Sequence, residues 1–136
     1  MQVHKCNIHD LHQLTQFNKR LIEDEQSDNT MNEAELYQRM QTFITTEYDA
    51  YFFIEKESII GYALVKNTSS PLYLRQFYID RQFRRMHYGE KAFHELLAYL
   101  RISTIDIEVL TWNERAIRFW EKLNFKERSK YMRYNG

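Results

Sequence analysis

The chain has 136 residues, of which 43% are hydrophobic and 15% aromatic, enough for one domain with a core of its own. Its 19 basic and 19 acidic residues give a formal net charge of zero, which argues against the broad positive field of a nucleic-acid-binding protein. No apolar run is longer than a strand, so we expect no membrane span. The single cysteine, Cys6, cannot form an internal disulfide. We therefore expect one cytoplasmic domain over residues 1–136, with Cys6 buried rather than acting as a nucleophile.

Hydrophobic periodicity predicts strands and helices along the whole chain. In chain order we expect a strand at 2–6, helices with apolar positions at 11–22 and 36–44, strands at 50–55, 59–66 and 72–79, a helix from about 88 to 100, a strand at 105–110, a helix with apolar positions at 116–123, and terminal strands at 126–128 and 131–134. Strands that alternate with helices in the second half indicate a mixed sheet covered by helices, an α/β (α+β) fold.

Polar residues mark the helix boundaries in the first half. Asn7 or His9 is expected to cap the first helix, and the spacing of Thr30 to Glu33 is that of a capping box for the second. Between the helices, residues 23–29 contain no apolar side chain, which predicts an exposed loop. Its carboxylates could attract a cationic amine, although an exposed acidic loop is the simpler interpretation.

Cationic side chains gather just before the helix expected to begin at Tyr88 or Gly89. They are Arg81, Arg84, Arg85, His87 and Lys91. A cation at a helix N-terminus costs about 0.3 to 1 kcal/mol, so the cluster suggests an anion that binds the free N–H groups of the first turn. The alternative is a solvated charged loop.

A second motif follows the strand at 105–110. Thr111-Trp112-Asn113 leads into a helix with apolar residues on one face, and Asn124 stands where a left-handed C-cap is expected.

Together, these two motifs resemble those of the GNAT superfamily of acyl-CoA N-acyltransferases. The R-x-x-G-x-G/A loop corresponds to residues 84–89, with His87 in place of the first glycine. The V-x-x-x-N-x-x-A-x-x-F-Y-x-x-x-G-F motif corresponds to Val109, Asn113, Ala116, Phe119, Trp120, Asn124 and Phe125, with Trp and Asn in place of the usual Tyr and Gly. Gly61 also resembles the glycine of an "iGy" strand in that family.

The resemblance implies a GNAT-like fold in which the strands at 72–79 and 105–110 splay apart to admit the pantetheine arm of acetyl-CoA. It implies that the cofactor contacts Tyr78, Ile79, Arg84, Arg85, Met86, His87, Tyr88, Gly89 and Asn113. Backbone groups of Tyr78 and Ile79 would pair with pantetheine, and the N–H groups of residues 85–89 would hold the pyrophosphate.

Catalytic roles are implied for two residues. Trp120 replaces a tyrosine that protonates the departing thiolate in several relatives, and its indole N–H can donate a hydrogen bond but not a proton. Loss of that tyrosine need not abolish activity, because a thiol titrates near pH ~8.5. Glu108 matches a proposed general base, and a solvated strand carboxylate is an equal alternative. Tyr131 or Tyr134 could approach the site, although ordinary packing is the simpler role.

The resulting prediction is an acetyltransferase that moves acetyl from acetyl-CoA to a primary amine by direct transfer in a ternary complex. An inactive CoA-binding sensor with the same fold is the main alternative, and a phosphate-loop nucleotide or RNA binder is a weaker one. No metal is expected, since His9 and His12 lack further ligands in sequence. A homodimer is compatible with the sequence, which does not identify the acceptor.

Overall fold

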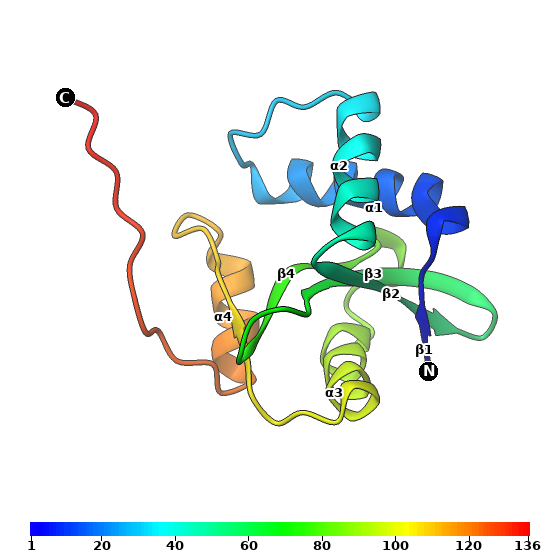
Figure 1. The fold of residues 1–136 in the computed structure, drawn as a ribbon. Helices are drawn as coiled ribbons and strands as arrows, with labels where there is room; N and C mark the ends of the chain where they lie inside the picture. Colours follow the sequence, from blue (N-terminus) through cyan, green and yellow to red (C-terminus); the bar gives the residue numbers. More distant parts are fainter.

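The computed structural model describes all residues, 1–136, and contains a five-stranded sheet with two helices on each face (Figure 1). Its elements are β1 (Gln2–Lys5), η1 (Ile8–Asp10), α1 (Leu11–Glu25), α2 (Glu33–Thr45), β2 (Tyr48–Glu55), β3 (Ser58–Lys66), β4 (Leu72–Ile79), η2 (Arg81–Phe83), α3 (Tyr88–Leu100), β5 (Ile105–Ile107) and α4 (Glu114–Lys122). The mixed α/β architecture and the order of the first nine predicted strands and helices are confirmed. None of these helices is both long and apolar enough to cross a membrane.

The sheet has the order β1-β2-β3-β4-β5, in which neighbouring strands are antiparallel except for the parallel pair β4–β5. Helix α3 makes the crossover that a parallel pair requires. In Figure 1, α1 and α2 lie above the sheet, and α3 and α4 lie below it.

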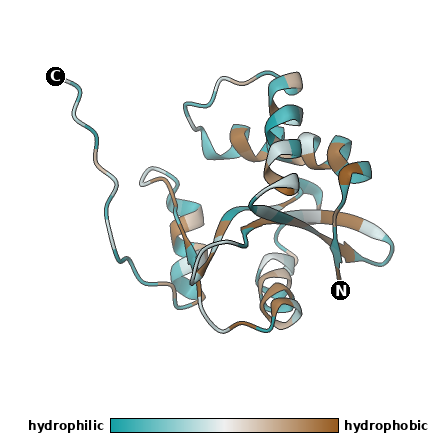
Figure 2. Ribbon diagram, in the orientation of Figure 1, coloured by the Kyte–Doolittle hydropathy of each residue, from teal (hydrophilic) through white to brown (hydrophobic).

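Alternation along the strands fills a separate core on each face of the sheet. Phe52, Tyr62 and Leu64 pack with Leu14 and Phe17 of α1. The opposite face packs against α3 and α4, with residues that include Phe53, Ala63, Phe93, Leu96 and Trp120. In Figure 2, where the ribbon is coloured by residue hydropathy, hydrophobic residues occur along the strands and in the helices that cover them.

Both early helix boundaries differ from the sequence prediction. Helix α1 continues to Glu25 and ends at Gln26 in the left-handed conformation, so the first acidic residues of the expected loop are helical. Helix α2 is capped by Asn32, whose side chain forms a capping box with Glu35. That cap lies two residues after Thr30, which was the predicted one.

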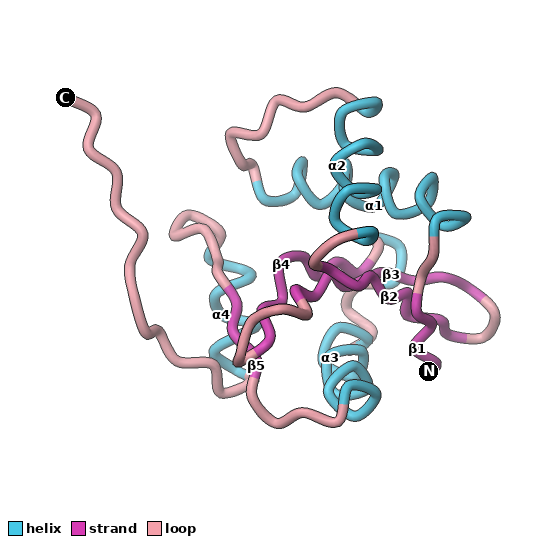
Figure 3. Tube along the Cα trace, in the orientation of Figure 1, coloured by secondary structure: helices cyan, strands magenta, loops and turns pink.

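The terminal strands predicted at 126–128 and 131–134 do not form. After Phe125 the chain runs as an extended tail outside the sheet (Figure 3), and Tyr131 and Tyr134 are 81% and 93% exposed. Neither tyrosine therefore lies in the interior. The alternating apolar and polar residues of this segment have no other element to pack against, and such packing is the main force that stabilises a strand.

Candidate active site

Strands β4 and β5 separate halfway along β4. Leu72, Tyr73 and Leu74 pair with residues 105–107, and no later residue of β4 has a partner in β5. Strand β5 ends at Ile107 rather than at the predicted Leu110 for this reason. The splay predicted between the two strands is thus present, and it leaves one edge of β4 open.

The open edge of β4 presents the backbone of Ile79. Asp80 donates its N–H to the Ile60 carbonyl of the neighbouring chain segment at 2.8 Å. Because successive residues of a strand point their amides in opposite directions, the Ile79 amide faces the splay and the Tyr78 amide faces β3. The Tyr78 carbonyl also lies 2.0 Å from the Cβ position of a side chain placed at Gly61, so only glycine allows β3 and β4 to approach this closely.

The N-terminus of α3 lies directly after the open edge of β4, and its backbone donors are free. None of the N–H groups from Arg85 to Glu90 donates a hydrogen bond within the protein, and His87 caps the helix without a side-chain bond. Arg85 and His87 have φ values of 65° and 61°, in the left-handed region that favours glycine. Such turns direct successive N–H groups into a concave site for an anion.

Arg84 is held by protein groups rather than extended into solvent. Its Nε donates to the Ile79 carbonyl at 2.8 Å, its guanidinium pairs with Asp24, and it lies 5.3 Å from the centre of the Tyr78 ring. Arg81 pairs with the same Asp24 at 2.9 Å. Two cations of the predicted cluster therefore join the end of β4 to the end of α1.

Two further cations, one from the turn before α3 and one from α4, form no ion pair. Arg85 is exposed and forms no ion pair. Arg115, from the first turn of α4, lies within electrostatic range of this turn: burial, followed by the charges of Arg84 and Arg85, lowers the pKa of Arg115. Asn113 caps α4 by accepting from the Ala116 N–H at 3.3 Å, which leaves its amide NH₂ unpaired. Met86 is exposed beside this cluster.

Trp120 lies in the core. It is 9% exposed and contacts the rings of Phe77, Phe93, Phe119 and Phe125, with centroids 4.8 to 5.5 Å away. The indole thus forms a wall under β4. Cys6 is buried on the other side of the sheet, where burial raises the pKa of its thiol, as expected for a structural cysteine.

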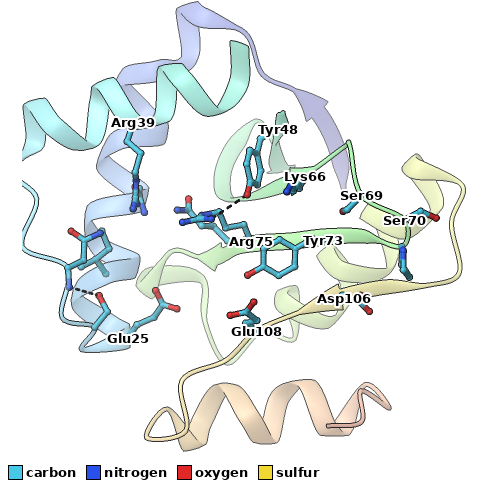
Figure 4. Close-up of a pocket in the computed structure, with 16 residues that line it drawn as sticks. Glu25, Arg39, Tyr48, Lys66, Ser69, Ser70, Tyr73, Arg75, Asp106 and Glu108 are labelled. Carbon is cyan, nitrogen blue, oxygen red and sulfur yellow. Dashed lines mark hydrogen bonds between the residues drawn. The ribbon is translucent and has the colours of Figure 1, made fainter. Parts of the chain in front are cut away.

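A polar cavity of about 660 Å³ lies on the α1–α2 side of the splay. Residues from α1, α2, β4 and β5 line it, including Glu25, Arg39, Arg75, Gln76 and Glu108 (Figure 4). A β-bulge places Arg75 there, since Leu64 pairs with Gln76 but Val65 pairs with Leu74. The extra residue lets Arg75 and Gln76 line the same cavity, as bulges commonly redirect side chains.

Glu108 and Tyr73 lie beside each other in this cavity (Figure 4). Burial, followed by the charge of Glu108, raises the pKa of Tyr73 to about 12, so the phenol is protonated at neutral pH. Burial also raises the pKa of Glu25, and Asp24 adds to this effect. The Glu108 carboxylate, at the open end of the splay, is therefore adjacent to the neutral phenol of Tyr73.

Sequence reasoning missed Arg39, Arg75, Tyr73 and Arg115 as site residues. Arg39 is a polar position on an amphipathic helix, and Arg75 and Tyr73 interrupt an apolar strand. The interruption at Arg75 was the one available signal, because a charge inside a strand pattern can mark a bulge.

Comparison with known proteins agrees with this geometry. The acetyltransferase (GNAT) family model matches residues 8–125. A possible acetyltransferase from Clostridium difficile 630 has a similar structure, with a TM-score of 0.81 and 15% identity over 99% of this chain and 96% of that one. The aminoglycoside N-acetyltransferase AAC(6')-Iy, in complex with CoA, has a TM-score of 0.73 and 11% identity over 99% of this chain and 93% of that one.

A third structure, of a predicted acetyltransferase with acetyl-CoA from Clostridium acetobutylicum, has a TM-score of 0.71 and 15% identity, covering 98% of this chain and 95% of that one. At these identities the structural likeness establishes the fold, whereas the family model covers most of the sequence. The chain belongs to the acetyltransferase (GNAT) family.

Proposed function

We propose that this protein transfers the acetyl group of acetyl-CoA to a primary amine by direct attack in a ternary complex. The observation that carries the proposal is the run of free N–H groups from Arg85 to Glu90 at the end of β4. These donors and the helix dipole suit a pyrophosphate, with Arg85 and Arg115 as nearby positive charges. Two structurally similar proteins were solved with CoA or acetyl-CoA.

The chain offers suitable partners for the rest of the cofactor. The Ile79 amide faces the splay, where it can pair with pantetheine as an added strand would. Its N–H is also the candidate donor for the oxyanion that develops as the amine attacks the thioester carbonyl. The amide NH₂ of Asn113 is free for a polar group of the cofactor.

Direct attack fits the residues around the splay better than an acetyl-enzyme intermediate. The one cysteine is buried in the core under α1 and α2, and neither cysteine nor histidine lines the polar cavity. A serine would need a neighbouring base such as histidine to become a nucleophile. We expect initial-rate plots with both substrates varied to intersect. Parallel lines, the pattern of a covalent intermediate, would contradict direct transfer.

The decisive experiment measures binding and turnover separately. Calorimetry with CoA and acetyl-CoA tests the cofactor site, and thiol release from acetyl-CoA with a panel of primary amines tests catalysis. We expect both to be positive. Binding with no thiol release from any amine would instead support the inactive CoA-binding sensor, and no binding would remove both functions.

Glu108→Gln should lower kcat by about 100-fold, at the lower end of the range for loss of a general base. The reason is that Glu108 lines the cavity at the open end of the splay and can accept a proton from the acceptor's ammonium, which gives the neutral amine that attacks. The pH–rate profile should also lose its acidic limb. Glu114→Gln, at an exposed carboxylate on α4, is the control. A rate unchanged by Glu108→Gln would mean that Glu108 is a solvated carboxylate and not the general base.

His87→Gly should strengthen acetyl-CoA binding about fivefold, a gain of about 1 kcal/mol. Without a Cβ, the left-handed residue lets its N–H approach phosphate more closely. Arg101→Gly is the matched control, because Arg101 is also left-handed, with φ 56°, but lies at the other end of α3. It should raise stability without changing affinity. Weaker binding by His87→Gly in calorimetry would show that the imidazole itself holds the cofactor.

A further inference from the structure

Two arginines in the polar cavity lack a counter-ion. Arg39 donates to Asn18 Oδ1 at 3.1 Å and Arg75 donates to the Tyr48 hydroxyl at 3.3 Å, and both acceptors are uncharged. Neither guanidinium pairs with a carboxylate, whereas Arg20, Arg81 and Arg84 all do. The cavity thus contains two positive charges that no direct ion pair neutralises.

The two guanidinium groups are held close together. Both lie over the Phe43 ring, at 5.4 Å for Arg39 and 4.9 Å for Arg75. Burial, followed by the charge of Arg75, lowers the pKa of Arg39. The Nε of Arg39 is buried and has no hydrogen-bond partner. Paired cations with an unused donor are suited to a planar anion such as a carboxylate, which arginine binds through two parallel bonds.

Carboxylates without a cation partner lie across the same cavity. Glu25 comes from the end of α1, and Asp106 and Glu108 come from β5 and the residue after it; none of them forms an ion pair. In Figure 4, Arg39 and Arg75 point toward one another on one side, and Glu25 and Glu108 lie on the other. The cavity therefore has separate positive and negative ends, and Glu108 lies at the end near the splay.

We propose that the acceptor is a zwitterion, an amino acid or a short peptide, whose carboxylate binds Arg39 and Arg75 and whose amine is directed toward Glu108 and the splay. This substrate class rests on the proposed acetyltransferase function. The ammonium gives one proton to Glu108, and the nitrogen lone pair then forms a bond to the acetyl carbon. The C–S bond breaks and its electron pair stays on sulfur. The thiolate takes the second proton, which the nitrogen releases as the amide forms, to give free CoA and an N-acetyl amino acid.

The test separates recognition from turnover. Calorimetry in the presence of CoA measures the binding of each standard L-amino acid and of glycylglycine. Every ligand is compared with its C-terminal amide, which keeps the amine and loses the negative charge. We expect at least one zwitterion to bind, its amide to bind about 10- to 100-fold more weakly, and Arg75→Gln or Arg39→Gln to remove that preference. Arg118→Gln, on the exposed face of α4, should change nothing.

If no zwitterion binds, or if amide and acid bind equally well to the unaltered protein, the proposal is overturned. A preference for the acid that survives in both arginine variants also overturns it. Arg75→Lys provides a second variant if Arg75→Gln does not fold, and it should retain part of the preference because it keeps the charge. Thiol release with the same ligands tests the transferase function separately, since a bound zwitterion that is not acetylated contradicts only that function.

Discussion

Gly61→Ala is expected to destabilise the protein by about 3 kcal/mol or more, the upper range for overpacking a core. The added Cβ would lie 2.0 Å from the Tyr78 carbonyl oxygen and 3.0 Å from the Ile79 Cα. Backbone atoms cannot move aside as a flexible side chain can, so β4 must shift away from β3. This shift would also displace the Ile79 amide. Urea denaturation should therefore show a lower midpoint, and calorimetry should show weaker acetyl-CoA binding.

Gly89→Ala is the matched control for this change. The Cβ at Gly89 would meet side-chain atoms alone: ring atoms of Phe119 at 3.1 and 3.2 Å, and the Ile79 Cγ1 at an ordinary 3.9 Å. Alanine in a helix also gains about 1 kcal/mol over glycine. The two effects oppose each other, so stability should change by less than about 1 kcal/mol. Equal losses in Gly61→Ala and Gly89→Ala would mean that close backbone approach at Gly61 is not what holds β3 and β4 together.

Local signals predicted most of the fold. The start of α3 at Tyr88, the bounds of β4 and the glycine in β3 follow from periodicity and from motifs that act within a few residues. The splay followed from the family resemblance, because no local pattern encodes the separation of two strands. The predicted final strand failed for a related reason: alternation shows which face could be buried, but not whether a partner edge is available.

The charged residues were harder to assign, because charge alone does not reveal a partner. Arg84 and Arg85 are adjacent in the same loop, yet Arg84 turns inward to Asp24 and Arg85 stays exposed. The acidic segment that sequence placed in a loop supplies that partner from the end of α1. Arg39 and Arg75 lie close together because α2 packs over the sheet and because β4 contains a bulge, and sequence predicted neither. Cytoplasmic location and a homodimer stay predictions.

Arg84→Gln should destabilise the protein by about 2 kcal/mol, the range for losing hydrogen bonds to a charged group. The Arg84 side chain is only 20% exposed, and it links the Ile79 carbonyl to Asp24 through the same guanidinium. Its loss would leave Asp24 with Arg81 alone and would free the end of β4. Thermal denaturation should show a lower midpoint, and Arg84→Lys should lose nearly as much, because a single ammonium cannot reach both acceptors.

Arg85→Gln separates this structural role from cofactor binding. Arg85 is exposed and unpaired, so its loss should leave stability unchanged and weaken acetyl-CoA binding about fivefold, the effect of one surface charge contact of about 1 kcal/mol. That weakening should fade at high salt, since exposed charges are screened. The expected contrast is a stability defect at position 84 and a salt-dependent affinity defect at position 85. If Arg84→Gln instead kept full stability and lost affinity in the same salt-dependent way, Arg84 would leave Asp24 to bind the phosphates.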